Sequence, residues 1–244
     1  MTQRSIQAGK TPTVIVKAGM DVQVEGWDDE RVLAATEHKW GLKIERGSAS
    51  AVGHMRARAK VGDRVLFDVS TDLLKRKKKD VPDDAVLVQV GGDATVRVPY
   101  GSTVTVYAGR SVDVRDIRGS VTVYAGRDVR LRHVYTLVHV SAGRALDLDC
   151  ESLAEDNCKF SAGRDLRFYV RDLRDAKIMV DDLGGDWVGV IGDGRRQIRL
   201  KAGGDVTLVT DQPVKGQSPD EVLGHVEPPP QGADEEGRGT KNPT

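Results

Sequence analysis

The chain has 244 residues and a mass of 26.5 kDa, which is long enough to bury a core without disulfides or metals. Its 37 Lys and Arg balance 37 Asp and Glu, so no net field attracts a nucleic acid or an anionic membrane. There is no apolar run of transmembrane length, and Met1–Ala18 lacks the apolar core of a signal peptide. These features predict a cytoplasmic protein, peripheral to a membrane at most, with no specific recognition of nucleic acid.

Residues 1–10 are expected to form a flexible N-terminus, and residues 11–85 an irregular β region. Alternating apolar residues in runs such as Thr13–Val16 indicate strands. Because terminal repeats are atypical, this region is interpreted as a β cap or as irregular early rungs. Trp27 and Trp40 are expected to cover the end of the core.

A basic loop is expected at 71–85. Such a run of cations either contacts an anionic polymer or lipid surface, or only keeps the loop soluble. The candidate contact residues are Lys75, Arg76, Lys77, Lys78 and Lys79.

A repeat dominates residues 86–214. The tripeptide Ala-Gly-Arg recurs at spacings of 17, 17 and 20 residues, inside a longer template of apolar-x-apolar-x-x-Gly-x-x-apolar-x-apolar. The template fits seven times, with one glycine in each unit: Gly19, Gly91, Gly109, Gly126, Gly143, Gly163 and Gly203. An eighth unit around Gly185 fits imperfectly, and a bulge is expected between Asp181 and Leu183.

Period-2 alternation on both sides of a fixed glycine indicates two short strands joined at a corner. The glycine marks a position where a side chain is costly, and a positive φ is expected there. A unit of about 17–22 residues cannot bury its own apolar face, whereas stacked units bury a continuous interior. The sequence therefore predicts an all-β fold, a single-chain β-solenoid (β-helix) with an irregular N-terminal β cap.

Residues at equal distances from successive glycines should become neighbours in such a stack. Four residues after the glycine the charge alternates, in the order Asp113, Arg130, Asp147 and Arg167. Two residues before the glycine lie Tyr107, Tyr124, Ser141 and Ser161, which indicate a partly exposed turn.

A column of like charge follows each central glycine and is the main candidate for binding. It consists of Arg110, Arg127, Arg144 and Arg164. Guanidinium groups at regular spacing suit a polymer of repeating anions. The alternative is a turn ladder neutralised by acids such as Asp128 and Asp165.

Other chemistry has weaker signals. The histidines, including His133 and His139, show no metal-ligand spacing, and no metal or cofactor is predicted. The acidic clusters Asp28–Glu30 and Asp181–Asp182 leave open a glycan-active enzyme. The glycine-rich run 189–194 is interpreted as a turn. Two cysteines, Cys150 and Cys158, are expected to be buried free thiols rather than a disulfide or a reactive site.

From residue 215 to 244 the composition shifts to Gly, Pro and acids with no apolar period. Such a segment cannot bury enough surface to order itself. A disordered acidic, Pro-rich tail is expected there.

Several segments together resemble a family of bacterial domains called putative adhesins. They are Val22–Asp28, Val96–Gly101, Gly119–Val123 and Ala125–Val129. The resemblance covers about residues 12–212 and implies a β-solenoid with a structural or adhesive role and no catalytic residues. This chain has Arg where the family pattern often has Ser before Gly-Asp, and it shows no export signal. Bactofilin-like cytoskeletal solenoids are similar in architecture only.

Three hypotheses follow. The first is a non-enzymatic structural or adhesin-like scaffold that associates with itself through its ends, or with another protein. The second is a module that binds an anionic polymer or lipid surface through the arginine column. The third is a glycan-active β-helix enzyme.

Overall fold

The computed structural model describes residues 1–37, 41–47, 56–61, 64–70, 85–153, 157–182, 185–211 and 215–217. Every regular element in these ranges is a β-strand, so the fold is all-β. No helix within them has the length and apolar character to cross a membrane. The strands are β1 (Thr2–Gln7), β2 (Thr13–Ala18), β3 (Val22–Trp27), β4 (Arg31–Thr36), β5 (Leu42–Arg46), β6 (Arg56–Val61), β7 (Arg64–Ser70), β8 (Val86–Val90), β9 (Ala94–Pro99), β10 (Thr103–Ala108), β11 (Val112–Arg115), β12 (Ser120–Ala125), β13 (Val129–Ala142), β14 (Leu146–Ser152), β15 (Asn157–Ala162), β16 (Leu166–Asp172), β17 (Ala176–Asp182), β18 (Gly185–Val190), β19 (Arg196–Ala202), β20 (Val206–Thr210) and β21 (Lys215–Gln217).

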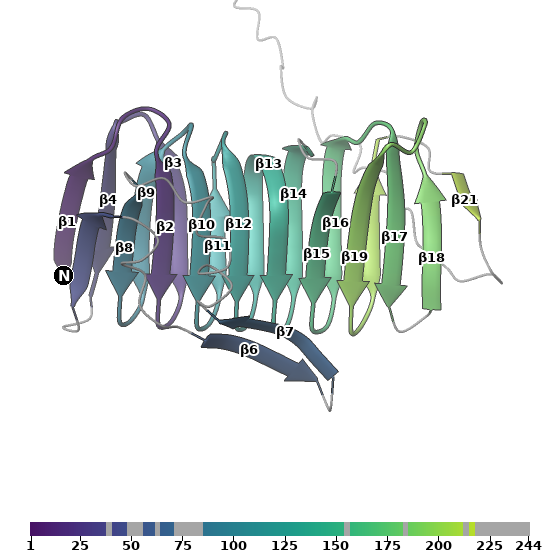
Figure 1. Ribbon diagram of the computed structural model, residues 1–244, viewed down its shortest axis with the longest axis horizontal. Coiled ribbons are helices and arrows are strands. Elements are labelled where there is room, and N and C mark those ends of the chain that lie inside the picture. Colours follow the sequence, from purple (N-terminus) through teal and green to yellow (C-terminus); the bar gives the residue numbers. More distant parts are fainter. Residues whose placement is uncertain are drawn as a thin grey trace, which may run out of the picture.

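Nineteen of these strands form one sheet folded into two layers, and they lie side by side along the long axis of the molecule (Figure 1). Strands β6 and β7 form a separate antiparallel pair. Layer A contains the strands that lead into the corner glycines, together with β5, β17, β18 and β21. Their order is β5-β8-β2-β10-β12-β13-β15-β19-β17-β18-β21. Layer B contains the strands that leave these glycines, together with β1 and β4, in the order β1-β4-β9-β3-β11-β13-β14-β16-β20. Strand β13 is long enough to belong to both layers.

All seven predicted strand–corner–strand units are present, and they stack in parallel register. Val104 pairs with Val121, for example, and Val112 with Val129. The predicted alternation of charge is confirmed, because Arg130 lies in register between Asp113 and Asp147.

The order of the units in space differs from their order in sequence. The first unit, β2–β3, lies between β8–β9 and β10–β11. Near the other end, β19–β20 stacks directly on β15–β16, and β17 lies on the far side of β19. Antiparallel strands cover both ends of layer A and the N-terminal end of layer B.

The predicted bulge around Gly185 is wrong. Strands β17 and β18 form an antiparallel hairpin whose register is unbroken from Lys177 with Val190 to Asp182 with Gly185. The chain reverses direction here instead of turning a corner into layer B, so the apolar pattern continues while the topology changes.

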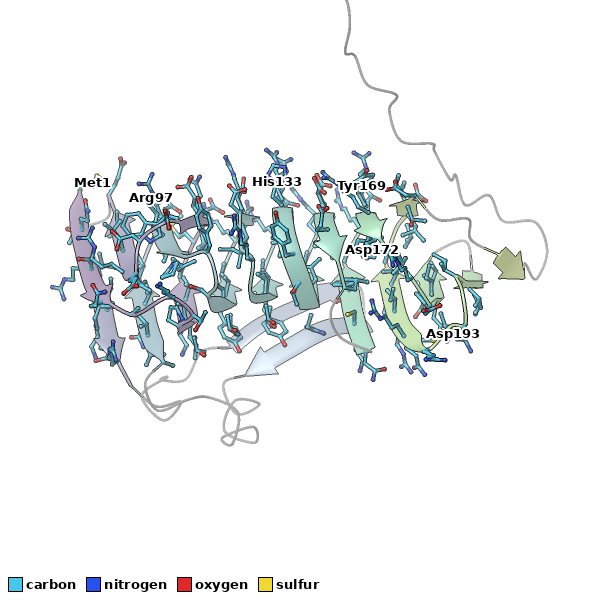
Figure 2. The ribbon with its side chains drawn as sticks, turned by 90° about the horizontal axis from the view of Figure 1, so that it is seen from above. Met1, Arg97, His133, Tyr169, Asp172 and Asp193 are labelled. Atoms are coloured by element: carbon cyan, nitrogen blue, oxygen red, sulfur yellow. The ribbon has the colours of Figure 1, made fainter. Side chains whose placement is uncertain are left out.

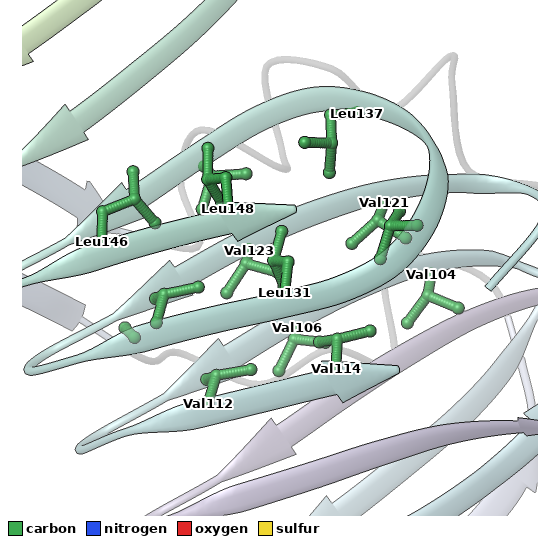
Figure 3. Packing of buried hydrophobic residues seen from close by; sticks show 14 of the residues in the cluster. Val104, Val106, Val112, Val114, Val121, Val123, Leu131, Leu137, Leu146 and Leu148 are labelled. Carbon is green, nitrogen blue, oxygen red and sulfur yellow. The ribbon is translucent and has the colours of Figure 1, made fainter. Parts of the chain in front are cut away.

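The core lies between the layers and consists of the inward residues of each strand. Figure 3 shows Val106 and Val123 of layer A facing Val114 and Leu131 of layer B. These four side chains are at most 1% exposed. Alternate residues point outward, so the two outer surfaces carry the polar side chains that could bind a partner.

Candidate functional site

The corner glycines are required by the approach of neighbouring backbone. A Cβ atom built on Gly109 would lie within 3.0 Å of the carbonyl oxygen of Gly19, and one on Gly126 equally close to that of Gly109. The expected positive φ is wrong for both, since the described glycines with positive φ are Gly9, Gly41, Gly192 and Gly194. The predicted turn in 189–194 is confirmed at Gly192 and Asp193, whereas Gly189 and Val190 belong to strand β18.

The arginine column is assembled by the backbone beside these corners. The N–H of Arg127 donates to the carbonyl oxygen of Arg110 at 3.0 Å, that of Arg144 to Arg127 at 2.9 Å, and that of Arg164 to Arg144 at 2.7 Å. Four guanidinium groups therefore leave the same edge of four consecutive units.

Only one of these four groups has a carboxylate partner among the described residues. Arg144 donates to Asp128 through Nε at 2.8 Å and Nη2 at 2.5 Å. This hydrogen bond is the largest reason why the pKa of Asp128 lies below its ordinary value. No described carboxylate lies within 4.0 Å of the guanidinium groups of Arg110, Arg127 or Arg164.

A second column, of aspartates two residues after the glycine, was not recognised from the sequence. Each carboxylate accepts a hydrogen bond from the backbone N–H of the next unit in the stack. Ser111 N donates to Asp21 at 2.8 Å, and Ala145 N donates to Asp128 at 3.2 Å. Asp93 and Asp165 accept from Asp21 N and Asp205 N at 3.0 and 3.3 Å. The recurrent Gly-x-Asp spacing in the sequence could have identified this column of aspartates.

The outer surface of layer B carries a groove of about 1070 Å³ that is lined by residues of six strands, β4, β9, β3, β11, β13 and β14. Its charged lining includes Asp21, Asp93, Asp113, Arg115, Arg130 and Arg144. Part of this charge is neutralised within the groove, because Arg115 lies 3.0 Å from Asp113. Figure 2 shows Arg97, His133 and Tyr169 along this side of the stack, with Asp193 on the opposite side.

The outer surface of layer A carries the predicted column of Tyr and Ser. The rings of Tyr107 and Tyr124 stack at 5.3 Å, and the hydroxyls of Ser141 and Ser161 lie 2.7 Å apart. The expected partial exposure is wrong for Tyr107, which is 7% exposed because it packs with Ile15 and Leu87 on the outward side of the layer. Burial raises the pKa of both tyrosines.

A buried lysine next to this column was also missed. Lys17 lies in register with Tyr107 and is 5% exposed. Loss of hydration lowers its pKa to about 8. The apolar neighbours at 14–16 gave no indication that an outward lysine would be covered.

In each acidic cluster one carboxylate is paired with a cation. Asp29 accepts two hydrogen bonds from Arg31 Nε, both at 3.1 Å, which is the largest reason for its lowered pKa. A carboxylate held in its charged form is a poor general acid. Asp181 forms an ion pair with Lys201, and the side chain of Asp182 lies outside the described residues.

The remaining candidates are also placed. Cys150 and Cys158 are buried thiols outside any disulfide, as predicted, and burial is the main cause of the raised pKa of Cys150. His133 is exposed and lies 3.2 Å from Asp116. Among the described residues no group of three or more His, Cys, Asp or Glu could hold a metal ion.

Trp27 does not lie at an end of the stack, because β3 has neighbours on both sides. Its ring lies 5.8 Å from the guanidinium groups of Arg31 and Arg97. Trp40 and the basic residues Lys75 to Lys79 lie outside the described residues.

No protein-family model matches this chain, and no curated protein does. It is similar to the crystal structure of a putative cell adhesion protein from Clostridium sporogenes ATCC 15579, with 8% sequence identity and a TM-score of 0.32. The match covers 86% of this chain and 99% of that one. A TM-score of this size does not establish a shared fold.

Proposed function

We propose that the protein is a non-enzymatic, adhesin-like scaffold built as a β-solenoid. The observation that carries the proposal is the in-register stacking of seven units, from β8–β9 at one end to β19–β20 at the other. A stack of this kind presents the same surface positions at the strand spacing of about 4.8 Å.

The outward polar side chains support this proposal because many of them bind the next unit. Arg97 contacts Glu25 across units at 3.0 Å, and Arg144 contacts Asp128 in the same way. The hydroxyl groups of Ser141 and Ser161 form a hydrogen bond with each other. Groups committed to holding the stack are expected to give a rigid platform rather than a site for chemistry.

The scaffold can bind a partner at its ends or along its sides. At each end the two layers extend to different positions, so the ends are stepped. Beyond the last complete unit, layer A continues with β17, β18 and β21, whereas β20 is the last strand of layer B among the described residues. Beyond the first unit, layer B continues with β4 and β1, and layer A with β5 alone. If β1 of a second copy were placed against β20 of the first, strands β5 and β8 of the second copy would occupy the positions of β18 and β21 of the first. The two copies would therefore clash. The steps favour partner binding over unbroken head-to-tail growth.

Light scattering with small-angle X-ray scattering over a wide concentration range tests the scaffold. We expect an elongated particle whose mass stays constant with concentration. A compact, near-spherical particle would contradict the solenoid, and growth into rods would contradict the preference for partner binding.

A second candidate function is binding of an anionic polymer along the arginine column. It is favoured by the three guanidinium groups that lack a described carboxylate partner, Arg110, Arg127 and Arg164. The basic run Lys75 to Lys79 remains a separate prediction for the same ligand class.

Inorganic polyphosphate is a suitable probe for this column. We expect its affinity to fall with salt and to drop by about tenfold in an Arg127→Ala, Arg164→Ala double variant, since charged contacts contribute about 0.5–1 kcal/mol each. Arg31→Ala is the matched control, because Arg31 is paired with Asp29 and lies off the column. Equal affinities in the double variant and the control would exclude the column as the binding surface.

A further inference from the structure

The outer surface of layer A carries a group of cations where β15, β19 and β17 lie side by side. Lys159, Arg199 and Lys177 occupy outward positions on these three strands, and all three side chains are exposed. Among the described residues, no carboxylate lies within 4.0 Å of their charged groups. We call these three residues the basic patch.

The fourth cation of this surface is neutralised, in contrast to the basic patch. Lys201 forms an ion pair with Asp181 of the adjacent strand. In layer B the charges of register partners alternate along the stack. Lys159, however, lies in register with Arg199. Because like charges directly opposite each other destabilise a sheet, the basic patch is expected to attract an anionic group.

The described chain ends in the same row of the sheet as two of these cations. The row runs through register partners on β15, β19, β17, β18 and β21, which are Lys159, Arg199, Met179, Val188 and Gln217. Gln217 is the last described residue, and β21 lies beside β18 at the end of the stack (Figure 1). Four strand spacings separate Gln217 from Lys159, which is about 20 Å.

Residues 218–244, the acidic tail, carry a surplus of negative charge. They contain six carboxylate side chains and two cationic ones, Arg238 and Lys241. Three of the six carboxylates are consecutive, at Asp234, Glu235 and Glu236. Because the whole chain has no net charge, residues 1–217 carry the opposite surplus. Charge complementarity therefore favours the chain's own tail as the occupant of the basic patch.

The position of this acidic triplet in the tail matches the distance to the basic patch. Asp234 lies 17 residues after Gln217, and a chain of that length without secondary structure spans about 20–25 Å on average. Asp220 and Glu221 follow Gln217 too closely, since even four fully extended residues reach only about 14 Å. The triplet is therefore the acidic cluster that can reach the whole patch.

We propose that Asp234, Glu235 and Glu236 dock on the basic patch of the same chain and neutralise it. The tether holds the triplet at a roughly millimolar effective concentration, so that individually weak contacts together keep the tail in place. An anionic partner would have to displace the tail to reach this surface. The proposal goes beyond the scaffold function, and the basic patch is a different surface from the arginine column, so each can fail separately.

Carbodiimide cross-linking of the full chain tests the proposal, because this reagent joins an amine to a carboxylate only where the two are in contact. At low salt we expect a cross-link from Lys159 or Lys177 to the triplet, identified by mass spectrometry. We expect it to disappear at about 1 M salt, where charges are strongly screened. Lys43 and Glu45, whose charged groups lie 2.7 Å apart, provide the internal control for the reaction at low salt. Absence of the cross-link at low salt, or its persistence at about 1 M salt, would overturn the proposal.

Arg199→Ala gives a sharper test, because arginine does not itself react with a carbodiimide. We expect the yield of the cross-link between Lys159 and the triplet to fall about two- to fivefold, the effect of losing one exposed charge contact. Arg167→Ala is the matched control, since Arg167 is an exposed arginine of the same region on the outer surface of layer B. Equal yields in the two variants would contradict docking on the basic patch.

An equal mixture of isotope-labelled and unlabelled chains distinguishes the chain's own tail from that of a second copy. We expect both peptides of each cross-linked pair to carry the same label. Pairs of mixed label as a main product would show that the tail docks on another chain, and would overturn the proposal.

Discussion

Gly126 carries the sharpest steric requirement at the scale of a single residue. A Cβ atom at this position would meet the backbone carbonyl of Gly109, which cannot move without shifting its own unit. We expect Gly126→Ala to lower the free energy of unfolding by about 1–3 kcal/mol, the usual cost of overpacking. Urea denaturation followed by circular dichroism measures it.

Thr122→Ala is the control for this change. Thr122 lies on β12, the strand that leads into Gly126, and its side chain is only partly buried, so its substitution should stay within about 0.5 kcal/mol. Equal unfolding midpoints for the two variants would contradict the steric account of the corner.

Asp128 contacts the next unit twice through one carboxylate, at the side chain of Arg144 and at the backbone N–H of Ala145. Asp128→Asn keeps an oxygen for Ala145 N and loses the charge that pairs with Arg144. Because this pair is largely exposed, we expect a loss of only about 0.5–1 kcal/mol at pH 7, measured by urea denaturation.

The pH dependence of this variant has a defined sign. The pKa of Asp128 is lowered in the folded chain, so its contribution is present above the ordinary carboxyl pKa and is lost as pH falls through the folded value. We expect the stability difference between wild type and Asp128→Asn to shrink below about pH 4. A difference that is constant from pH 3 to pH 7 would rule out the ion pair as its cause.

At the scale of elements, the β15–β16 unit has an aromatic contact inside the core. Phe160 and Phe168 face each other from the two layers, with ring centroids 5.0 Å apart. We expect Phe160→Ala to cost about 3–5 kcal/mol. Since each unit contacts only its neighbours, hydrogen exchange should rise first in residues 157–172 and in the two adjacent units, 137–152 and 196–210.

Lys159→Ala is the control, because Lys159 is exposed on the same strand. A uniform rise in exchange along the whole chain after Phe160→Ala would contradict stability that depends on adjacent units.

The elements could be predicted from the sequence to the extent that period 2 and glycine spacing define them. All seven units were found in this way, and the charge alternation gave their register. The β17–β18 hairpin could not be predicted, because an antiparallel strand has the same alternation as a parallel one. The predicted positive φ was wrong because glycine is required here by a long-range contact and not by the local backbone conformation. A Cβ atom on Gly109 would clash with Gly19, which lies 90 residues away in sequence.

The arginine column was predicted because it follows the repeat directly. The ion pairing within the column was not predicted, because Asp128 pairs with Arg144 of the next unit and not with its chain neighbour Arg127. The burial of Lys17 depends on which strands lie next to each other. Such neighbours are visible only in the folded chain.

At the scale of the whole molecule, the order of the units is the feature that the sequence concealed. Spacing indicates that β2–β3 is a unit but not where it enters the stack. Its place between β8–β9 and β10–β11 means that residues about 90 positions apart support each other. The N-terminal segment is thus a part of the stack and not only its cover.

The most direct test of this account is disulfide trapping between outward residues of layer B. Gln23 lies in register with Asp113 on one side and with Thr95 on the other. We expect mild oxidation to cross-link a Gln23→Cys, Asp113→Cys variant, because parallel register partners lie within disulfide reach, and to leave Thr95→Cys, Asp113→Cys unlinked. Peptide mapping by mass spectrometry identifies the bond. A cross-link in the second variant and none in the first would show units stacked in sequence order and would contradict the account.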